Sequence, residues 1–336
     1  MKCVCIAFTE QGWKLSQRLS CSLEGWEMKC SRGFGAEKVA LKHWTTAAFQ
    51  EADALLFIGA AGIAVRAIAP HVQSKMKDPA VLVVDEEGRF VISLLSGHMG
   101  GANRLARQLA AVSGGQAVLT TATDVRDLWA VDEWAVQQHF VICNPEKIKD
   151  VSAALLRGEI IHIYSDLPIA GKPPRLISLT EKKAAAQVIV SPFSLEPDEC
   201  SALQLVPPVI SVGIGCRKGS RRQDIERTFQ SALQEAQIRR EAIRTVSSID
   251  LKKSEAGLLL FCEENEWPLL TYSAEELSCV QGSQARSDFV ERITGVDNVC
   301  ERSALKNGGH LVLPKYARSG VTIAFAMQEI PCSFEM

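Results

Sequence analysis

The segment Phe90-Val-Ile-Ser-Leu-Leu-Ser-Gly-His-Met-Gly-Gly-Ala-Asn103 joins a short apolar run to a glycine-rich turn and then to a predicted helix. Beyond it, Leu105, Leu109 and Ala110 recur on one face at helical spacing. This order of strand, turn and helix predicts free backbone N–H groups and the positive end of a helix at the carboxyl edge of a sheet, where an anion binds well. His98 lies in the turn and is the only side chain of the segment that exchanges a proton near neutral pH.

Apolar strands and amphipathic helices alternate around this segment. The runs Lys2–Thr9, Ala54–Ile58 and Ala80–Asp85 read as buried strands, and helices are expected between them, including one over Glu37–Ala52. Strands that are apolar on both faces and alternate with helices indicate a mostly parallel, doubly wound sheet. We therefore predict an α/β protein whose N-terminal domain, residues 1–135, has this fold.

Prolines punctuate the middle of the chain. They interrupt the short strands and helices of residues 136–207, which predicts a small middle module and a linker. A new apolar run, Val209–Cys216, then begins a separate C-terminal α/β domain over residues 208–336.

The composition is that of an ordinary globular enzyme. The 336 residues are 47% apolar and 23% charged, and the formal net charge of -2 argues against a dedicated nucleic-acid-binding protein. Cysteines are numerous but form no CxxC pair, which is typical of free thiols in a reducing cytosol. No run reaches the length of a membrane span, so we expect a cytoplasmic protein without a membrane partner.

Three glycine-rich turns are expected after apolar strands, at Gly59–Gly62, Ser96–Gly101 and Gly213–Gly219. In an open α/β sheet, ligands bind outside the carboxyl ends of the strands, where such turns meet. Any one of these turns is also explained as a tight strand-to-helix connection, but the three together favour anion binding. A dinucleotide fingerprint would need glycine in place of Lys218, and no phosphate-binding loop motif occurs.

Polar side chains near these turns are candidates for the chemistry. Arg66 and Arg217 are cations of the kind that bind carboxylates through two hydrogen bonds. His98 is open to three interpretations: a general base, a ligand-binding group or a structural histidine. No second histidine lies at metal-ligand spacing, so no metal site of the protein's own is predicted.

Several carboxylates have simpler explanations as well. Asp124 and the hydroxyls before it either cap a following helix or line the site. Glu301 is predicted on a helix, where composition alone favours a solvated face. Lys75 and Asp78 are expected to be surface charges in an exposed loop.

Seven blocks of the sequence together resemble one known family. The blocks are Gly59–Arg66, Lys77–Val81, Val84–Asp85, Leu94–Asn103, Thr120–Asp124, Gly213–Arg217 and Gly295–Leu305. They resemble the cobalt-precorrin 5A hydrolase (CbiG) family of anaerobic cobalamin synthesis. The resemblance covers nearly the whole chain except its proline-punctuated middle.

The resemblance implies a reaction, the hydrolytic opening of the δ-lactone on a cobalt-bearing, ring-contracted tetrapyrrole with release of acetaldehyde. Cobalt is then carried by the substrate, and no cofactor of the protein's own is expected. Such a macrocycle is fringed with acetate and propionate carboxylates, which suits several anion-holding turns better than a single phosphate loop. The expected partners are this substrate and neighbouring enzymes of the corrin pathway.

On this resemblance the catalytic residues are His98, Asp124 and Glu301. In the predicted mechanism His98 takes the proton from water and the backbone N–H groups of Gly97–Gly101 hold the oxyanion. The predicted substrate-binding residues are Gly59, Gly62, Arg66, Ser96, Gly97, Gly100, Gly101, Asn103, Thr121, Thr123, Gly213, Gly215, Cys216 and Arg217. Two alternatives stay open: a non-catalytic tetrapyrrole carrier, and an α/β enzyme acting on a smaller phosphorylated or carboxylated metabolite.

Overall fold

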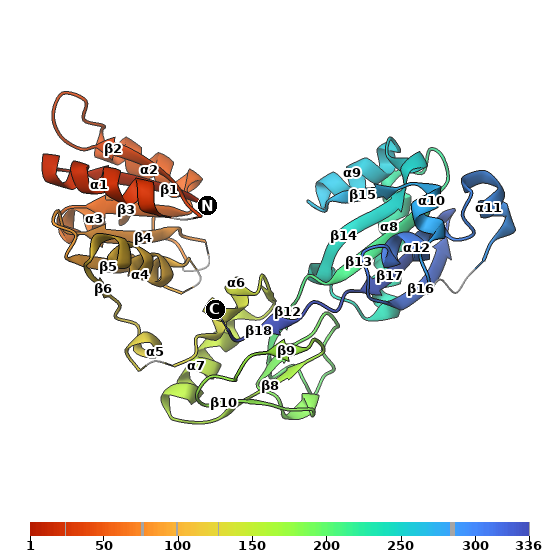
Figure 1. Ribbon diagram of the computed structural model, residues 1–336. Helices are drawn as coiled ribbons and strands as arrows, with labels where there is room; N and C mark the ends of the chain where they lie inside the picture. The colour runs from red at the N-terminus through yellow and green to blue at the C-terminus, as the bar shows by residue number, and fades with distance from the viewer. Residues whose placement is uncertain (24, 75–76, 99, 127, 283–285, 336) are drawn as a thin grey trace. The chain divides into compact units, whose positions relative to one another are not determined.

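The computed structural model describes residues 1–336 except 24, 75–76, 99, 127, 283–285 and 336 (Figure 1). The described residues form two compact units, Met1–Glu133 and Trp134–Met336. Both units are built from parallel or mixed sheets with helices packed against them, so the predicted α/β class is confirmed. Within the described residues, no helix is both long and apolar enough to cross a membrane.

The first unit holds a six-stranded sheet in the order β2-β1-β3-β4-β5-β6. Its strands are β1 (Lys2–Ala7), β2 (Glu27–Arg32), β3 (Ala54–Ile58), β4 (Ala80–Val84), β5 (Phe90–Leu95) and β6 (Gln116–Val118). Its helices are α1 (Glu10–Ser22), α2 (Leu41–Glu51), α3 (Ala61–Ile68), α4 (Ala102–Ser113), α5 (Ala122–Val125) and the start of α6 (Val131–Gln137). Apolar side chains of α1 and α4 pack on one face of the sheet, and those of α2 and α3 pack on the other, as in a doubly wound fold.

The direction of β5 corrects one expectation about the site. β5 runs antiparallel to β4, with Val84 opposite Val91 and Val81 opposite Leu95. The turn after β5 therefore lies at the end of the sheet where strand β4 begins. The turn at Gly59–Gly62 lies at the opposite end, where β3 and β4 finish. The physical reason is the link over residues 85–89, because a parallel pair needs a crossover of about a dozen residues.

Two further elements of the first unit differ from the sequence prediction. β2 was not expected, because its sequence Glu-Met-Lys-Cys-Ser-Arg is mostly polar and it forms the outer strand of the sheet. Helix α2 begins at Leu41, later than the predicted start at Glu37. Strand β3, in contrast, has the predicted bounds, and all of its residues are buried.

The second unit contains two five-stranded sheets, in the orders β10-β8-β11-β12-β7 and β15-β14-β13-β17-β16. The elements of the middle sheet are β7 (Val141–Ile142), η1 (Pro145–Lys147), α7 (Ile148–Leu156), β8 (Ile161–Ser165), β10 (Ile177–Leu179), η2 (Lys183–Ala185), β11 (Val188–Val190) and β12 (Leu203–Val206). The strands of the C-terminal sheet are β13 (Ile210–Cys216), β14 (Ile243–Ile249), β15 (Leu269–Tyr272), β16 (His310–Arg318) and β17 (Val321–Met327). Its helices are α8 (Arg222–Ala236), η3 (Arg240–Ala242), η4 (Asp250–Lys252), α9 (Ala256–Glu264), α10 (Ala274–Ser278), α11 (Asp288–Thr294) and α12 (Val299–Leu305). A short parallel pair, β9 (Ile169–Ala170) and β18 (Cys332–Ser333), completes the unit.

Candidate active site

The imidazole of His98 lies between two carboxylates of the first unit. Its Nε2 is 3.0 Å from Oδ2 of Asp124, and its Nδ1 is 3.4 Å from Oδ2 of Asp132. The hydroxyl of Thr123 is 3.3 Å from the same Nε2, and the histidine side chain is 16% exposed. A carboxylate at each ring nitrogen favours the doubly protonated ring, because both nitrogens then donate.

The charge of His98 follows from these contacts. The hydrogen bond to Asp132 and, after it, the contacts with Asp124 raise the pKa of His98 to about 9, although burial acts in the opposite direction. At pH 7 only about 1% of such a histidine is neutral. This favours His98 as a proton donor at the start of the reaction, and its predicted role as the base for water stays a prediction.

Asp124 is held by more donors than His98 alone. Its Oδ1 accepts from Nη2 of Arg107 at 2.6 Å, and its Oδ2 accepts from Nδ2 of Asn103 at 2.7 Å and from the hydroxyl of Thr121. Burial favours the neutral acid, but the hydrogen bonds from Thr121, His98 and Arg107 lower the pKa of Asp124 overall. Asp124 is thus a fixed carboxylate. Thr121 stands at the N-cap position of α5, as the capping alternative allowed, but its side chain makes no cap hydrogen bond and donates to Asp124 instead.

The turn between β5 and α4 is shaped by close packing at its glycines. A Cβ at Gly97 would lie 2.8 Å from Oδ1 of Asn103, and one at Gly100 would lie 2.4 Å from Cβ of Ser96. Gly101 caps α4 in the left-handed region, with φ of 79°. Ser96 has a φ of 56°, and its hydroxyl donates to the carbonyl oxygen of Asp78 at 2.9 Å.

The backbone N–H groups of this turn divide into two sets. Those of Gly101, Ala102 and Asn103 donate to carbonyl oxygens inside the turn. Those of Gly97, His98 and Gly100 have no acceptor among the residues that the structure describes. The predicted anion-holding group is therefore narrower than Gly97–Gly101. Met99, between them, lies outside the described residues.

Asp78 is not the surface charge that the sequence suggested. The residue is 7% exposed, and its carboxylate accepts from the backbone N–H groups of Gln73 and Ser74. Since its carbonyl oxygen also accepts from Ser96, Asp78 fixes the loop before β4 against the turn that carries His98. Lys75 lies outside the described residues.

The turn at Gly59–Gly62 lies at the opposite edge of the sheet from His98. A Cβ at Gly59 would lie 2.9 Å from the ring of Phe8, so close packing requires glycine there. Arg66 is exposed and its Nη1 lies 3.3 Å from the carbonyl oxygen of Gly62.

The third glycine-rich stretch is not a turn where the sequence predicted one. Gly213 and Gly215 lie inside β13; Gly213 pairs with Ser247 of β14 and with Ala324 of β17. A Cβ at Gly213 would lie 1.7 Å from the carbonyl oxygen of Cys300, so glycine is needed where α12 packs on the strand. The chain turns only after half-buried Cys216, beginning with the exposed Arg217.

Glu301 does not occupy the solvated face expected from composition. Its side chain is fully buried on α12, and its Oε1 accepts from the backbone N–H of Lys315 at 2.8 Å. Its own backbone N–H donates to Oδ1 of Asn298, the residue that caps α12. In this structure the carboxylate is out of reach of a ligand in solvent.

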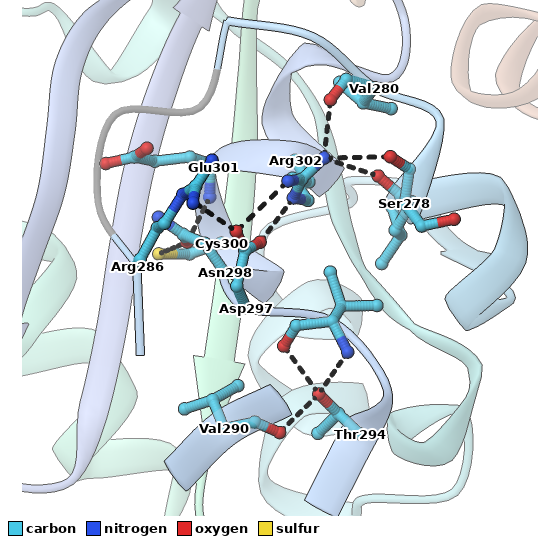
Figure 2. Close-up of polar contacts among 12 residues, drawn as sticks. Ser278, Val280, Arg286, Val290, Thr294, Asp297, Asn298, Cys300, Glu301 and Arg302 are labelled. Carbon is cyan, nitrogen blue, oxygen red and sulfur yellow. Dashed lines mark hydrogen bonds and ion pairs between the residues drawn. The ribbon is translucent and has the colours of Figure 1, made fainter. Parts of the chain in front are cut away.

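Next to Glu301, Arg302 ties α12 to two neighbouring segments (Figure 2). Its Nε and Nη2 donate to the two oxygens of Asp297, at 2.7 and 3.2 Å. Its Nη1 donates to the carbonyl oxygens of Leu277, Ser278 and Val280 around the end of α10. The hydrogen bonds from Arg302 also lower the pKa of Asp297.

The structure thus brings together one group of the predicted residues, in the first unit: His98, Asp124, Asn103, Thr121, Thr123 and the turn from Ser96 to Gly101. Glu301, Gly213, Gly215, Cys216 and Arg217 belong to the second unit. Among the described residues, no group of three or more histidine, cysteine, aspartate or glutamate side chains is arranged to hold a metal ion.

Two residues of the site were missed by sequence reasoning. Arg107 stands one helical turn after Asn103 on α4, and both reach Asp124, so the spacing of four residues was a usable signal. Asp132 had no such signal, because its contact with His98 arises from the tertiary fold alone.

Models of three protein regions match consecutive parts of the chain. Cobalamin synthesis G N-terminal matches residues 43–124, Cobalamin biosynthesis central region matches 129–207, and Cobalamin synthesis G C-terminus matches 210–326. The chain is 32% identical over 298 residues to a cobalt-precorrin-5A hydrolase of Priestia megaterium, covering 83% of this chain and 79% of the relative. The chain belongs to the cobalt-precorrin-5A hydrolase family. The family resemblance of the sequence blocks, and the hydrolase of cobalamin biosynthesis predicted from it, are thereby confirmed.

A second relative of known function supports the same conclusion. The enzyme of Salmonella typhimurium LT2 is 34% identical over 292 residues and covers 83% of each chain. A crystal structure of a putative cobalamin biosynthesis protein G homolog from Sulfolobus solfataricus aligns with 98% of this chain and 97% of its own, at 25% identity and a TM-score of 0.41.

Proposed function

We propose that this chain opens the δ-lactone of cobalt-precorrin-5A and releases acetaldehyde to give cobalt-precorrin-5B, with His98 as the group that moves protons in both steps. The observation that carries the proposal is the imidazolium of His98, held by two carboxylates beside three backbone N–H groups that have no acceptor in the described part of the chain. His98 and Asp124 lie in the part of the chain that matches the N-terminal family model, and Asp132 lies in the part that matches the central-region model. This cluster offers a proton donor and an oxyanion site within one turn.

The first step is lactone opening. The oxygen of water bonds to the lactone carbonyl carbon, and the N–H groups of Gly97, His98 and Gly100 stabilise the oxyanion, each by about 3 kcal/mol if well placed. The bond from that carbon to the ring oxygen then breaks. The departing oxygen takes a proton from the imidazolium of His98 and becomes a hydroxyl. Both protons of the attacking water pass to solvent, one as the water oxygen bonds to the carbonyl carbon and the other on ionisation of the new carboxyl group.

The second step needs a base, and the first step has produced one. The now neutral imidazole of His98 removes the proton of the new hydroxyl, the adjacent carbon–carbon bond breaks, acetaldehyde leaves and the electron pair passes into the macrocycle. His98 ends as the imidazolium with which it began. Asp124 supports both forms by keeping one ring nitrogen protonated.

Peripheral contacts complete the proposal. Arg217 of the second unit is an exposed guanidinium group of the kind that binds acetate and propionate carboxylates, and we propose it as a carboxylate-binding residue. Arg66 is assigned no contact with the substrate at His98, because the turn beside it lies at the opposite end of the sheet strands. We assign no proton transfer to Glu301, because its carboxylate is fully buried. A cytoplasmic location and contacts with neighbouring enzymes of the corrin pathway belong to the same proposal.

The proposal is tested by incubating the purified protein with cobalt-precorrin-5A under anaerobic conditions and trapping the aldehyde. We expect one equivalent of acetaldehyde per substrate. Binding with a changed visible spectrum but without aldehyde would instead identify a carrier. The absence of any spectral change would point to a smaller metabolite.

A further inference from the structure

We propose that Asp132 is a positioning residue for this reaction: it holds Nδ1 of His98 in the free enzyme and yields that nitrogen to the ring oxygen of the lactone. Nδ1 is then the nitrogen that donates and later accepts the proton. The inference rests on the proposed function for its role in catalysis. The pairing itself is a property of the free protein.

The two carboxylates beside His98 are held very differently. Asp124 accepts from Asn103, Thr121 and Arg107 in addition to Nε2 of His98. For Asp132, the structure records one side-chain contact among the described residues, to Nδ1 of His98 at the longer distance of 3.4 Å. A ligand that competes for a ring nitrogen therefore displaces Asp132 more easily than Asp124.

This asymmetry fixes the tautomer of the neutral ring. Nε2 faces Asp124 at 3.0 Å, and a carboxylate that accepts a hydrogen bond keeps that nitrogen protonated. The lone pair of neutral His98 is then on Nδ1. The same nitrogen serves as donor in lactone opening and as acceptor in acetaldehyde release.

The charges around His98 come from three helices. Asp124 lies on α5, Asp132 and Glu133 on α6, and Arg107 on α4. Burial raises the pKa of Glu133, so this carboxyl group supplies less negative charge at neutral pH than its neighbours do. Arg107 pairs with Asp124 and offsets part of that charge. Asp132 is therefore the carboxylate whose loss most changes the charge felt by His98.

The test is the pKa of His98, measured by NMR of ring-labelled histidine in the full chain, together with the pH profile of kcat/KM. We expect Asp132→Asn to lower the pKa of His98 by about one unit or more and to move the basic limb of the profile by the same amount. Asp132→Glu should restore both, because it returns a carboxylate. Glu51→Gln is the matched control, since Glu51 is 67% exposed and pairs with Lys2.

An unchanged His98 pKa in folded Asp132→Asn protein would overturn the proposal. So would a lowered pKa with an unmoved basic limb, because Asp132 would then not act through His98. If the pKa falls but even the wild-type chain releases no acetaldehyde, the proposed function fails while the pairing stands. The two failures are thus distinguishable.

Discussion

His98 carries a carboxylate at each ring nitrogen, and this sets its chemistry before any substrate arrives. Both nitrogens are occupied as donors, so the resting ring is an acid and not a base. A reaction that begins with an acid and continues with its conjugate base can use one such residue twice. Lactone opening needs a proton donor, and the loss of acetaldehyde that follows needs a base.

The pH dependence of the reaction shows which protonation state of His98 acts first. We expect kcat/KM to stay level between about pH 7 and 8 and to fall as the pH rises through about 9, the pKa of His98, because the active form is protonated. The measurement is steady-state release of acetaldehyde across this range. A rate that instead rises towards pH 9 would show that the neutral imidazole acts first.

The same ionisation affects stability. The pKa of His98 rises from 6.5 in the unfolded chain to about 9 in the folded protein. Protonation of His98 therefore stabilises the fold fully below pH 6.5, and this stabilisation is lost as the pH rises through about 9. The contribution is at most about 3 kcal/mol. The free energy of unfolding, measured with urea at pH 6 and at pH 10, should differ less between the two pH values for His98→Gln than for the wild type. Equal differences in the two proteins would contradict the ion-paired state.

Among the elements, the antiparallel β5 has the largest effect on the site. It carries the turn with His98 to the edge opposite Gly59–Gly62, so the two glycine turns of the first unit do not share one site. The short link over residues 85–89 already excluded a parallel pair. This was a signal in the sequence that the apolar pattern alone did not convey.

The glycine at the centre of β13 serves packing between elements. We expect Gly213→Ala to lower the free energy of unfolding by about 3 kcal/mol or more, because its Cβ would lie 1.7 Å from the carbonyl oxygen of Cys300. Gly62→Ala is the control, since a Cβ there meets only the end of the Arg66 side chain, at 3.4 Å. Urea denaturation measures both, and similar values for the two variants would refute the packing argument.

Arg302 holds α12 against the segment that precedes it, as Gly213 allows α12 to pack on β13. Replacement by alanine removes both bonds to Asp297 and those to three carbonyl oxygens, and should cost about 3 kcal/mol. Arg302→Lys should recover only part of the lost stability. A single ammonium group cannot donate at once to Asp297 and to the three carbonyl oxygens, as the edges of the planar guanidinium do. The free energy of unfolding is again the measurement. An alanine variant as stable as the wild type would show that these hydrogen bonds add nothing to the free energy of unfolding.

Sequence reasoning succeeded where a residue's surroundings are local. The bounds of β3 follow from a run that is apolar on both faces, and the turn around His98 follows from its glycines. It failed where the partner is distant in the chain. Asp132 meets His98 only through the fold, and the burial of Glu301 depends on the close packing of α12 on β13 that Gly213 permits.

At the scale of the whole molecule, the residues that match the family are shared between two units. The proposed proton-transfer group, His98, lies in the first unit, and Arg217, proposed to bind carboxylates, lies in the second. Binding of a large macrocycle rests on many such contacts, whereas the chemistry rests on one ring. Loss of His98 should therefore leave binding largely intact.

The most direct test is His98→Gln incubated with cobalt-precorrin-5A, with the opened hydroxy acid and acetaldehyde measured separately in a single turnover. Because His98 serves both steps, we predict that the variant binds the substrate and forms neither product. Formation of the opened acid or of acetaldehyde at the wild-type rate would contradict the account.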